Sequence, residues 1–120
     1  MSKYVFPFEK LDVWQLAVDL AEFVLDLLES FPSNKHFRMV GQMEAAVTSP
    51  AQNIAEGKGR QYKKEFIQFL NIARRSTFEN ANMAMLFEME GYISIEEKNE
   101  ILSALDELCR MITGFIKSLK

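Results

Sequence analysis

Residues 53–70, NIAEGKGRQYKKEFIQFL, contain a boundary between two helical patterns. Apolar residues at helical spacing precede Gly57, and we expect this glycine to end a helix as a left-handed cap with positive φ. A second helical pattern begins near Tyr62. The stretch therefore predicts two helices joined by a short turn, which favours antiparallel neighbours.

The same pattern extends over the rest of the chain. Helices are predicted over about 10–30, from 34–36 to 57, over 62–91 and from 94 to the C-terminus. Most of the five glycines and three prolines lie at the predicted breaks. Ser94 and Glu97 have the spacing of a capping box, in which each side chain binds the other residue's backbone amide. We expect an all-α, antiparallel up-down-up-down bundle, with residues 1–120 forming one domain.

Pro50 lies inside the second predicted helix. A proline there lacks an amide donor and crowds the carbonyl of Ala46. Apolar spacing resumes on both sides, which favours a kink, with Ser49 able to bind a freed carbonyl. Two short helices remain the alternative.

The first predicted helix has an unusually wide apolar surface. Its polar residues form one narrow stripe: Asp12, Gln15, Asp19, Glu22, Asp26 and Glu29. The remaining surface carries two adjacent apolar rows. Together these rows are wider than the apolar face of about 100° that a bundle helix needs. Either the helix packs deeply within its own chain, or part of this surface meets another subunit. We favour the second interpretation and predict a homo-oligomer.

Composition narrows the functional class. The formal net charge is −3, whereas proteins that bind nucleic acid or membrane surfaces over their whole exterior are usually basic. One cysteine excludes an internal disulfide and favours a reducing compartment. No segment approaches the roughly 20 apolar residues that cross a bilayer. We expect a cytoplasmic protein with no membrane partner.

The sequence offers no pattern typical of a catalytic site. His36 and Cys109 are the single histidine and cysteine, and no Glu-x-x-His pair is present to indicate a di-iron bundle. A nucleophile elbow is missing as well. Residues 57–60, GKGR, follow a helix, whereas a phosphate-binding loop follows a strand. We therefore predict no enzyme activity, metal, cofactor or small-molecule substrate.

Two polar groups lie within the predicted helices. Asn53 and Glu56 occupy a helix C-terminus, where a carboxylate opposes the helix dipole. We expect Glu56 to join two helices, a structural role, by binding cations across the turn or the backbone amides that open the third helix. The cations in reach are Arg60, Lys63 and Lys64. Ser76, Glu79 and Asn80 form a second group, predicted to be a polar layer inside the bundle or at a subunit contact.

Cations gather around the start of the third predicted helix. The set, called the basic patch below, comprises Lys58, Arg60, Lys63, Lys64, Arg74 and Arg75, with Tyr62 beside them. The segment 76–108 is strongly acidic. One interpretation is contact with nucleic-acid phosphates, with Tyr62 stacking on a base. The other is a solvated face that neutralises acidic helices, either those of this chain or those of a neighbouring subunit.

Several motifs together resemble a known family. The chain opens with FEKLDVW at residues 8–14 and continues with Gln42, NIAEG at 53–57, EFIQFLNIAR at 65–74 and Ser76-x-x-Glu79. This pattern, from Phe8 to Leu119, is similar to that of a bacterial four-helix-bundle family. Its members include proteins encoded within intervening sequences of 23S ribosomal RNA genes. The chain departs from the family pattern at Arg75, usually a small residue, and at Glu44 and Ala45, often arginines.

The resemblance implies a ring-like homopentamer of antiparallel four-helix bundles. A related protein, the accessory variability protein of diversity-generating retroelements, binds nucleic acid and a reverse transcriptase through a basic surface. The family implies no established activity. We therefore expect a non-enzymatic homo-oligomeric interaction or scaffold protein of unknown partner. The alternative is an RNA- or DNA-binding adaptor that uses the basic patch.

Overall fold

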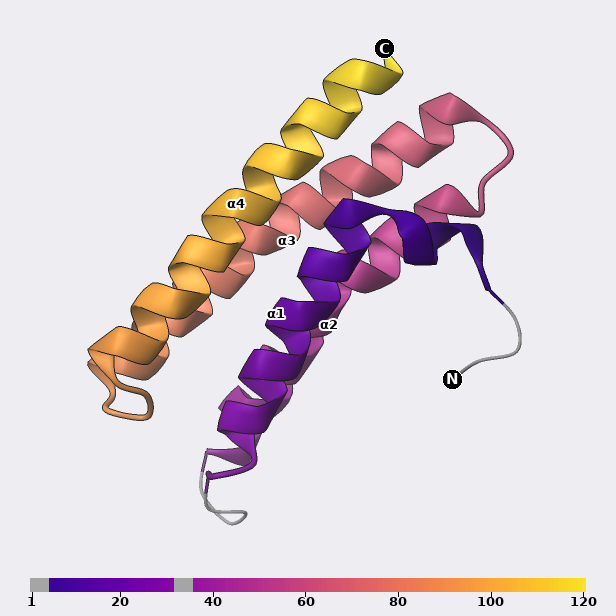
Figure 1. Cartoon of the computed structure of the whole chain (residues 1–120). Helices are drawn as coiled ribbons and strands as arrows, with labels where there is room; N and C mark the ends of the chain where they lie inside the picture. The colour runs from indigo at the N-terminus through magenta and orange to yellow at the C-terminus, as the bar shows by residue number, and fades with distance from the viewer. Residues whose placement is uncertain (1–4, 32–35) are drawn as a thin grey trace.

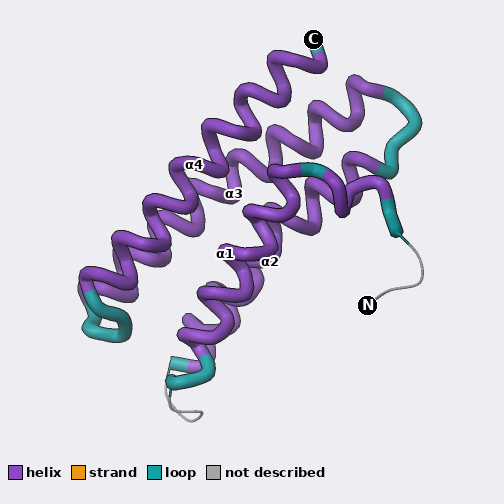
Figure 2. The backbone as a smooth tube through the Cα atoms, viewed as in Figure 1, coloured by secondary structure: helices purple, strands orange, loops and turns teal. Residues whose placement is uncertain are grey.

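The computed structural model describes residues 5–31 and 36–120, and its described part is all-α, without strands (Figure 2). A short 3-10 helix, η1 (Pro7–Lys10), precedes four long helices. These are α1 (Asp12–Leu28), α2 (Phe37–Lys58), α3 (Lys63–Met89) and α4 (Ile95–Leu119). The expected break at residues 31–34 lies largely outside the described residues.

Consecutive helices run antiparallel and form two hairpins, α1–α2 and α3–α4 (Figure 1). α2 and α3 share the most extensive helix contact. In the described part of the chain, α1 and α3 each pack on α2 and α4 but not on each other. α1 and α3 therefore occupy opposite corners of the bundle, which matters for the surfaces described below.

The polar stripe of α1 faces solvent along its whole length, as its spacing predicts. The two apolar rows of α1 face the other helices of the bundle. Every apolar residue of α1 is buried or half-buried by the described chain itself. Because α2, α4 and η1 cover much of this apolar surface, its width by itself does not require a second subunit.

The interior divides into two apolar clusters. One contains Val24, Met43 and Phe87 and lies toward the α3–α4 turn. The other contains Ile54, Leu70 and Ile112 and lies toward the α2–α3 turn. Along α2 and α3, a band of hydrogen-bonded polar side chains separates them.

Gly57 is not a left-handed cap, contrary to the sequence prediction. α2 continues through it to Lys58, and its cap Gly59 has φ −78°. Gly57 is buried where α3 crosses closely, and an added Cβ would lie 2.6 Å from the Cβ of Phe69. Among the described glycines, the one with positive φ is Gly91, at +79° in the α3–α4 turn. The glycine at position 57 thus permits close helix packing rather than an unusual backbone conformation.

Pro50 neither splits nor ends α2, so the two-helix alternative is wrong. The side-chain Nδ2 of Asn80 donates to the Ala46 oxygen at 2.7 Å. That oxygen is the one the missing amide of Pro50 leaves free. Ser49, expected to bind a freed carbonyl, instead directs its hydroxyl to α3.

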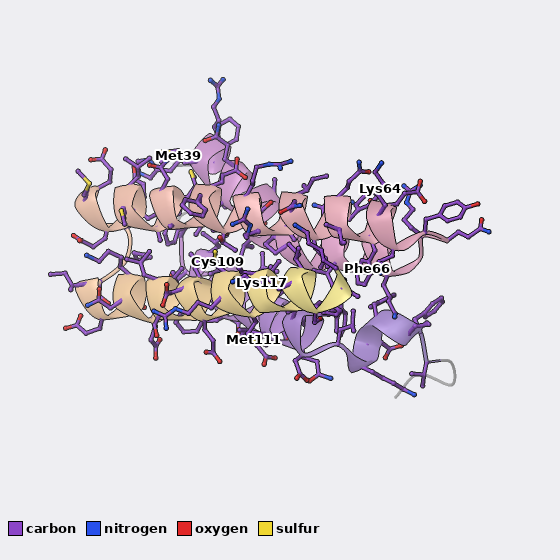
Figure 3. All side chains as sticks on the ribbon, turned by 90° about the horizontal axis from the view of Figure 1, so that it is seen from above. Met39, Lys64, Phe66, Cys109, Met111 and Lys117 are labelled. Carbon is purple, nitrogen blue, oxygen red and sulfur yellow. The ribbon has the colours of Figure 1, made fainter. Side chains whose placement is uncertain are left out.

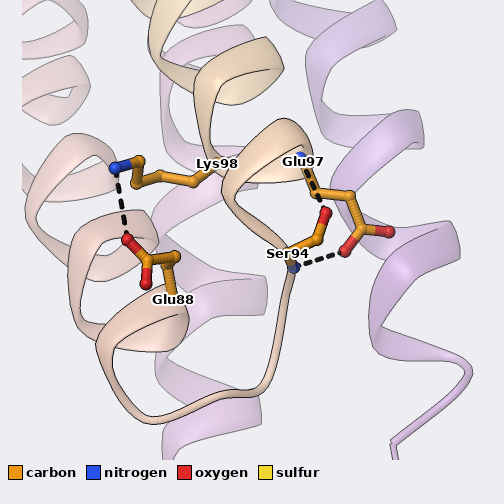
Figure 4. Close-up of polar contacts among 4 residues, drawn as sticks. All are labelled: Glu88, Ser94, Glu97 and Lys98. Carbon is orange, nitrogen blue, oxygen red and sulfur yellow. Dashed lines mark hydrogen bonds and ion pairs between the residues drawn. The ribbon is translucent and has the colours of Figure 1, made fainter.

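The capping box at the start of α4 is confirmed (Figure 4). The Glu97 amide donates to Ser94 Oγ at 3.0 Å, and the Ser94 amide donates to Glu97 Oε1 at 2.8 Å. Beside it, Lys98 Nζ lies 3.2 Å from Glu88 Oε1 and ties α4 to α3. These contacts fix the α3–α4 turn.

Candidate interaction surfaces

A polar layer crosses the α2–α3 contact between the two apolar clusters; it comprises Ser49, Asn53, Ser76 and Asn80. The hydroxyls of Ser49 and Ser76 are 2.8 Å apart. Asn53 Nδ2 donates to the backbone oxygen of Ser49 at 2.9 Å, and Asn80 Nδ2 donates to that of Ser76 at 2.8 Å. The structure thus places Ser76 and Asn80 inside the bundle. Glu79, predicted to share their layer, is exposed.

Glu56 does not join the helices, contrary to expectation. Its side chain is exposed, and within the described residues it forms no ion pair or hydrogen bond with Arg60, Lys63 or Lys64. The contact between α2 and α3 at this end is made by Gly57 and the phenylalanines of α3 instead. The tight packing at Gly57 therefore replaces the predicted ionic link.

Two cations of the basic patch, in and before the α2–α3 turn, lie over phenylalanine rings of α3. The guanidinium of Arg60 lies 4.7 Å from the Phe69 ring centre, and Lys58 Nζ lies 5.7 Å from that of Phe66. Such cation–π contacts restrain the long side chains while leaving the charges near solvent. Tyr62 is 62% exposed beside them.

The rest of the basic patch follows α3. Lys63, Lys64 and Arg75 are exposed, whereas Arg74 is half-buried with its Nε enclosed. Figure 3 shows Lys64 on the side of α3 facing away from α4, while Phe66 lies between those helices. The ion pairs of the described residues join other side chains, so none of them neutralises a charge of the patch.

The polar stripe of α1 is an acidic counterpart to this patch. Five of its six members are carboxylates, and all six are exposed: Asp12, Gln15, Asp19, Glu22, Asp26 and Glu29. None of the ion pairs in the described part involves them. The described part of the chain thus carries two surfaces of opposite sign, without ion pairs among its residues, on helices that do not contact each other.

Sequence reasoning missed an apolar surface on α3. Phe78 is 69% exposed, Met85 46%, Leu86 38% and Met89 74%. We call these four residues the α3 strip. Steps of seven and four positions from Phe78 to Met85 and Met89 keep them on one side of the helix. That spacing was visible in the sequence, but it resembles the spacing of core residues and could not show which side faces solvent.

The remaining candidate residues have structural partners. His36, at φ 57°, has its Nδ1 2.7 Å from the hydroxyl of Tyr92, whose ring lies against it. Cys109 is half-buried on α4 (Figure 3). Over the ranges 5–31 and 36–120, no cluster of three or more metal-ligating side chains occurs. No helix there has the length and hydropathy needed to cross a bilayer.

Comparison with known proteins identifies the family. The model of the 23S rRNA-intervening sequence protein family matches residues 9–114. The fold is similar to a crystal structure from Bacteroides thetaiotaomicron, described as a protein of unknown function from the S23 ribosomal protein family. The two chains superpose with a TM-score of 0.81 at 26% identity, over 88% of this chain and 98% of the other. Comparison with curated proteins finds no match. The chain belongs to the 23S rRNA-intervening sequence protein family.

Proposed function

We propose that this chain is a non-enzymatic interaction protein that assembles into a homo-oligomeric ring, with five copies as the family resemblance implies. The observation that carries the proposal is the pair of oppositely charged surfaces at opposite corners of the bundle. A ring needs a heterologous contact, in which two different surfaces of neighbouring copies meet. The acidic stripe of α1 and the basic patch of the next copy fit that requirement.

Electrostatics supports this pairing of surfaces. Charges of one sign gathered on one face repel each other, and an oppositely charged face of another copy relieves that repulsion. Complementary charge also orients the approaching subunits and disfavours contacts between two surfaces of the same charge. The cation–π contacts of Lys58 and Arg60 hold two of the charges in place before association.

Light scattering coupled to size exclusion tests the ring. We expect the wild-type protein to elute as a ring of five copies, or as a multiple of five, at micromolar concentration. The Asp19→Lys/Glu22→Lys variant should dissociate, as should Lys63→Glu/Lys64→Glu, because each places like charges at the contact. Combining all four changes should restore the large species. A monomeric wild type, or variants that stay fully assembled, would overturn the proposal.

Nucleic-acid binding is the second candidate, and a specific observation favours it. Tyr62 presents an exposed ring beside cations that have no ion-pair partner in the described structure. Cations that follow a backbone of phosphates and an aromatic ring that stacks on a base are the usual parts of a single-strand site. The same surface serves both candidates, so a covered patch would not bind nucleic acid.

Titration with single-stranded and with structured RNA separates the two candidates. Phosphate neutralisation predicts binding that weakens steeply between about 50 and 200 mM salt. The matched variant replaces Lys63, Lys64, Arg74 and Arg75 with glutamine and should lose that binding. Lys117→Gln/Lys120→Gln, on α4 and at its end, is the control. No binding at low salt, or binding unchanged in the four-residue variant, removes this candidate and leaves the ring proposal in place.

A further inference from the structure

The α3 strip is an apolar surface without a partner in the described structure. Its four large side chains lie on the second half of α3, away from the turn that carries most of the basic patch. Exposed apolar residues that gather on one helix face mark a contact surface rather than chance exposure. The strip shares no residue with the two charged surfaces that the proposed ring would use, and Arg75 of the basic patch borders it.

We infer that the α3 strip pairs with the strip of a second copy of this chain, about a two-fold axis that passes near Asn82. Two antiparallel α3 helices then pack face to face. In such a contact, a residue a given number of positions before Asn82 in one copy faces the residue the same number of positions after Asn82 in the other copy. Phe78 of one copy therefore lies against Leu86 of the other, with Met85 beside it, and Met89 lies toward Arg75 at the end of the strip. The two-fold axis makes each of these contacts twice.

The charged residues at the two ends of the strip favour a second copy of the chain as the partner and an antiparallel orientation of the two α3 helices. Arg75 precedes the strip and Glu90 follows it, at equal distances from Asn82 to within one position. Both side chains are exposed, and neither takes part in an ion pair of the described residues. They are about four helical turns apart, which leaves them on one flank of the strip.

Antiparallel pairing brings Arg75 of each copy to Glu90 of the other, so two ion pairs close the contact. Parallel pairing would place Arg75 beside Arg75 and Glu90 beside Glu90, which is repulsive. The surface is therefore complementary to itself in one orientation. This inference does not depend on the ring: without a ring the product is a dimer, and with one the strip joins two rings.

Disulfide trapping tests the two-fold axis directly. Helices packed about 8–10 Å apart bring facing Cα atoms near the axis to roughly 4–6 Å, within the range of a disulfide. In a Cys109→Ser background, Asn82→Cys should form a covalent dimer under mild oxidation. Gln68→Cys is the matched control, because it is exposed on the same helix but its copies would be about 40 Å apart.

Most Asn82→Cys chains should be cross-linked, and Gln68→Cys chains should remain single. Adding Phe78→Glu should abolish the cross-link, with far-UV circular dichroism confirming that the variant is folded. Failure of Asn82→Cys to cross-link, or equal cross-linking of both variants, would overturn the inference. Neither result bears on the charge variants that test the ring, so the two proposals can fail separately.

A charge swap tests the orientation. Arg75→Glu should weaken pairing roughly tenfold, because two attractive pairs become repulsive. Arg75→Glu combined with Glu90→Arg should restore it. If the swapped variant pairs no better than Arg75→Glu alone, the antiparallel register is wrong.

Discussion

Asn80 donates its side-chain amide to the backbone oxygen of Ala46 at a distance of 2.7 Å. In a regular helix that oxygen accepts from the amide four residues later, but position 50 is a proline and has no amide hydrogen. α3 thus supplies the donor that α2 lacks. The contact is buried, so losing it would leave the oxygen without a hydrogen bond and without water.

The first prediction concerns this contact. Asn80→Ala should lower the free energy of unfolding by about 2–3 kcal/mol, because it leaves a buried carbonyl unpaired and creates a cavity. In a Pro50→Ala background the loss should be smaller by about 1 kcal/mol, since the restored amide binds Ala46. Urea unfolding of the four proteins measures the coupling.

Gln68→Ala is the control for this cycle, as it removes an exposed amide from the same helix. It should change stability by less than about 0.5 kcal/mol. Strict additivity of the Asn80 and Pro50 changes would show that the side chain does not replace the missing amide.

A second prediction distinguishes two glycines of α2. Gly57→Ala should destabilise by about 1–3 kcal/mol, because the new Cβ would overlap Phe69 and Phe66 of α3, and Gly57→Val should cost more. Gly41→Ala meets open space and should stabilise by up to about 1 kcal/mol through helix propensity. Thermal melts that shift in the same direction for both alanine variants would contradict the packing explanation.

The third prediction concerns the capping box of α4. Ser94→Ala should cost about 1 kcal/mol, because the Glu97 amide loses its acceptor. Ser103→Ala, at an exposed position within the same helix, should be neutral or slightly stabilising. Chemical denaturation of both variants provides the comparison, and an equal effect at the two serines would exclude a capping contribution.

The fourth prediction concerns Glu56. Its exposed carboxylate lies in the last turn of α2, where it opposes the helix dipole without a partner in the described structure. Glu56→Ala should therefore change the stability of the isolated protomer by less than about 0.5 kcal/mol. A loss above about 1 kcal/mol in dilute protein would show that the ionic link to the α2–α3 turn does form.

The helices and their order can be predicted from local sequence patterns. Apolar spacing, the few glycines and prolines, and the Ser94–Glu97 pair act over one or two turns, so a single chain segment contains all the information they need. The solvent-facing stripe of α1 follows for the same reason, because a helical period fixes which residues share a face. The family resemblance rests on local motifs as well, and the family model matches nearly the same range.

The contacts between segments far apart in the sequence depend on how the helices pack in three dimensions. Gly57 has the position of a cap, yet the close approach of Phe69 determines its role. Pro50 can stay inside α2 because Asn80, thirty residues later, reaches Ala46. The strip of Phe78, Met85, Leu86 and Met89 has the spacing of a core face, and only the positions of α2 and α4 leave it in solvent. Periodicity shows which residues lie together on a helix, whereas burial depends on the neighbours that the fold places against that face.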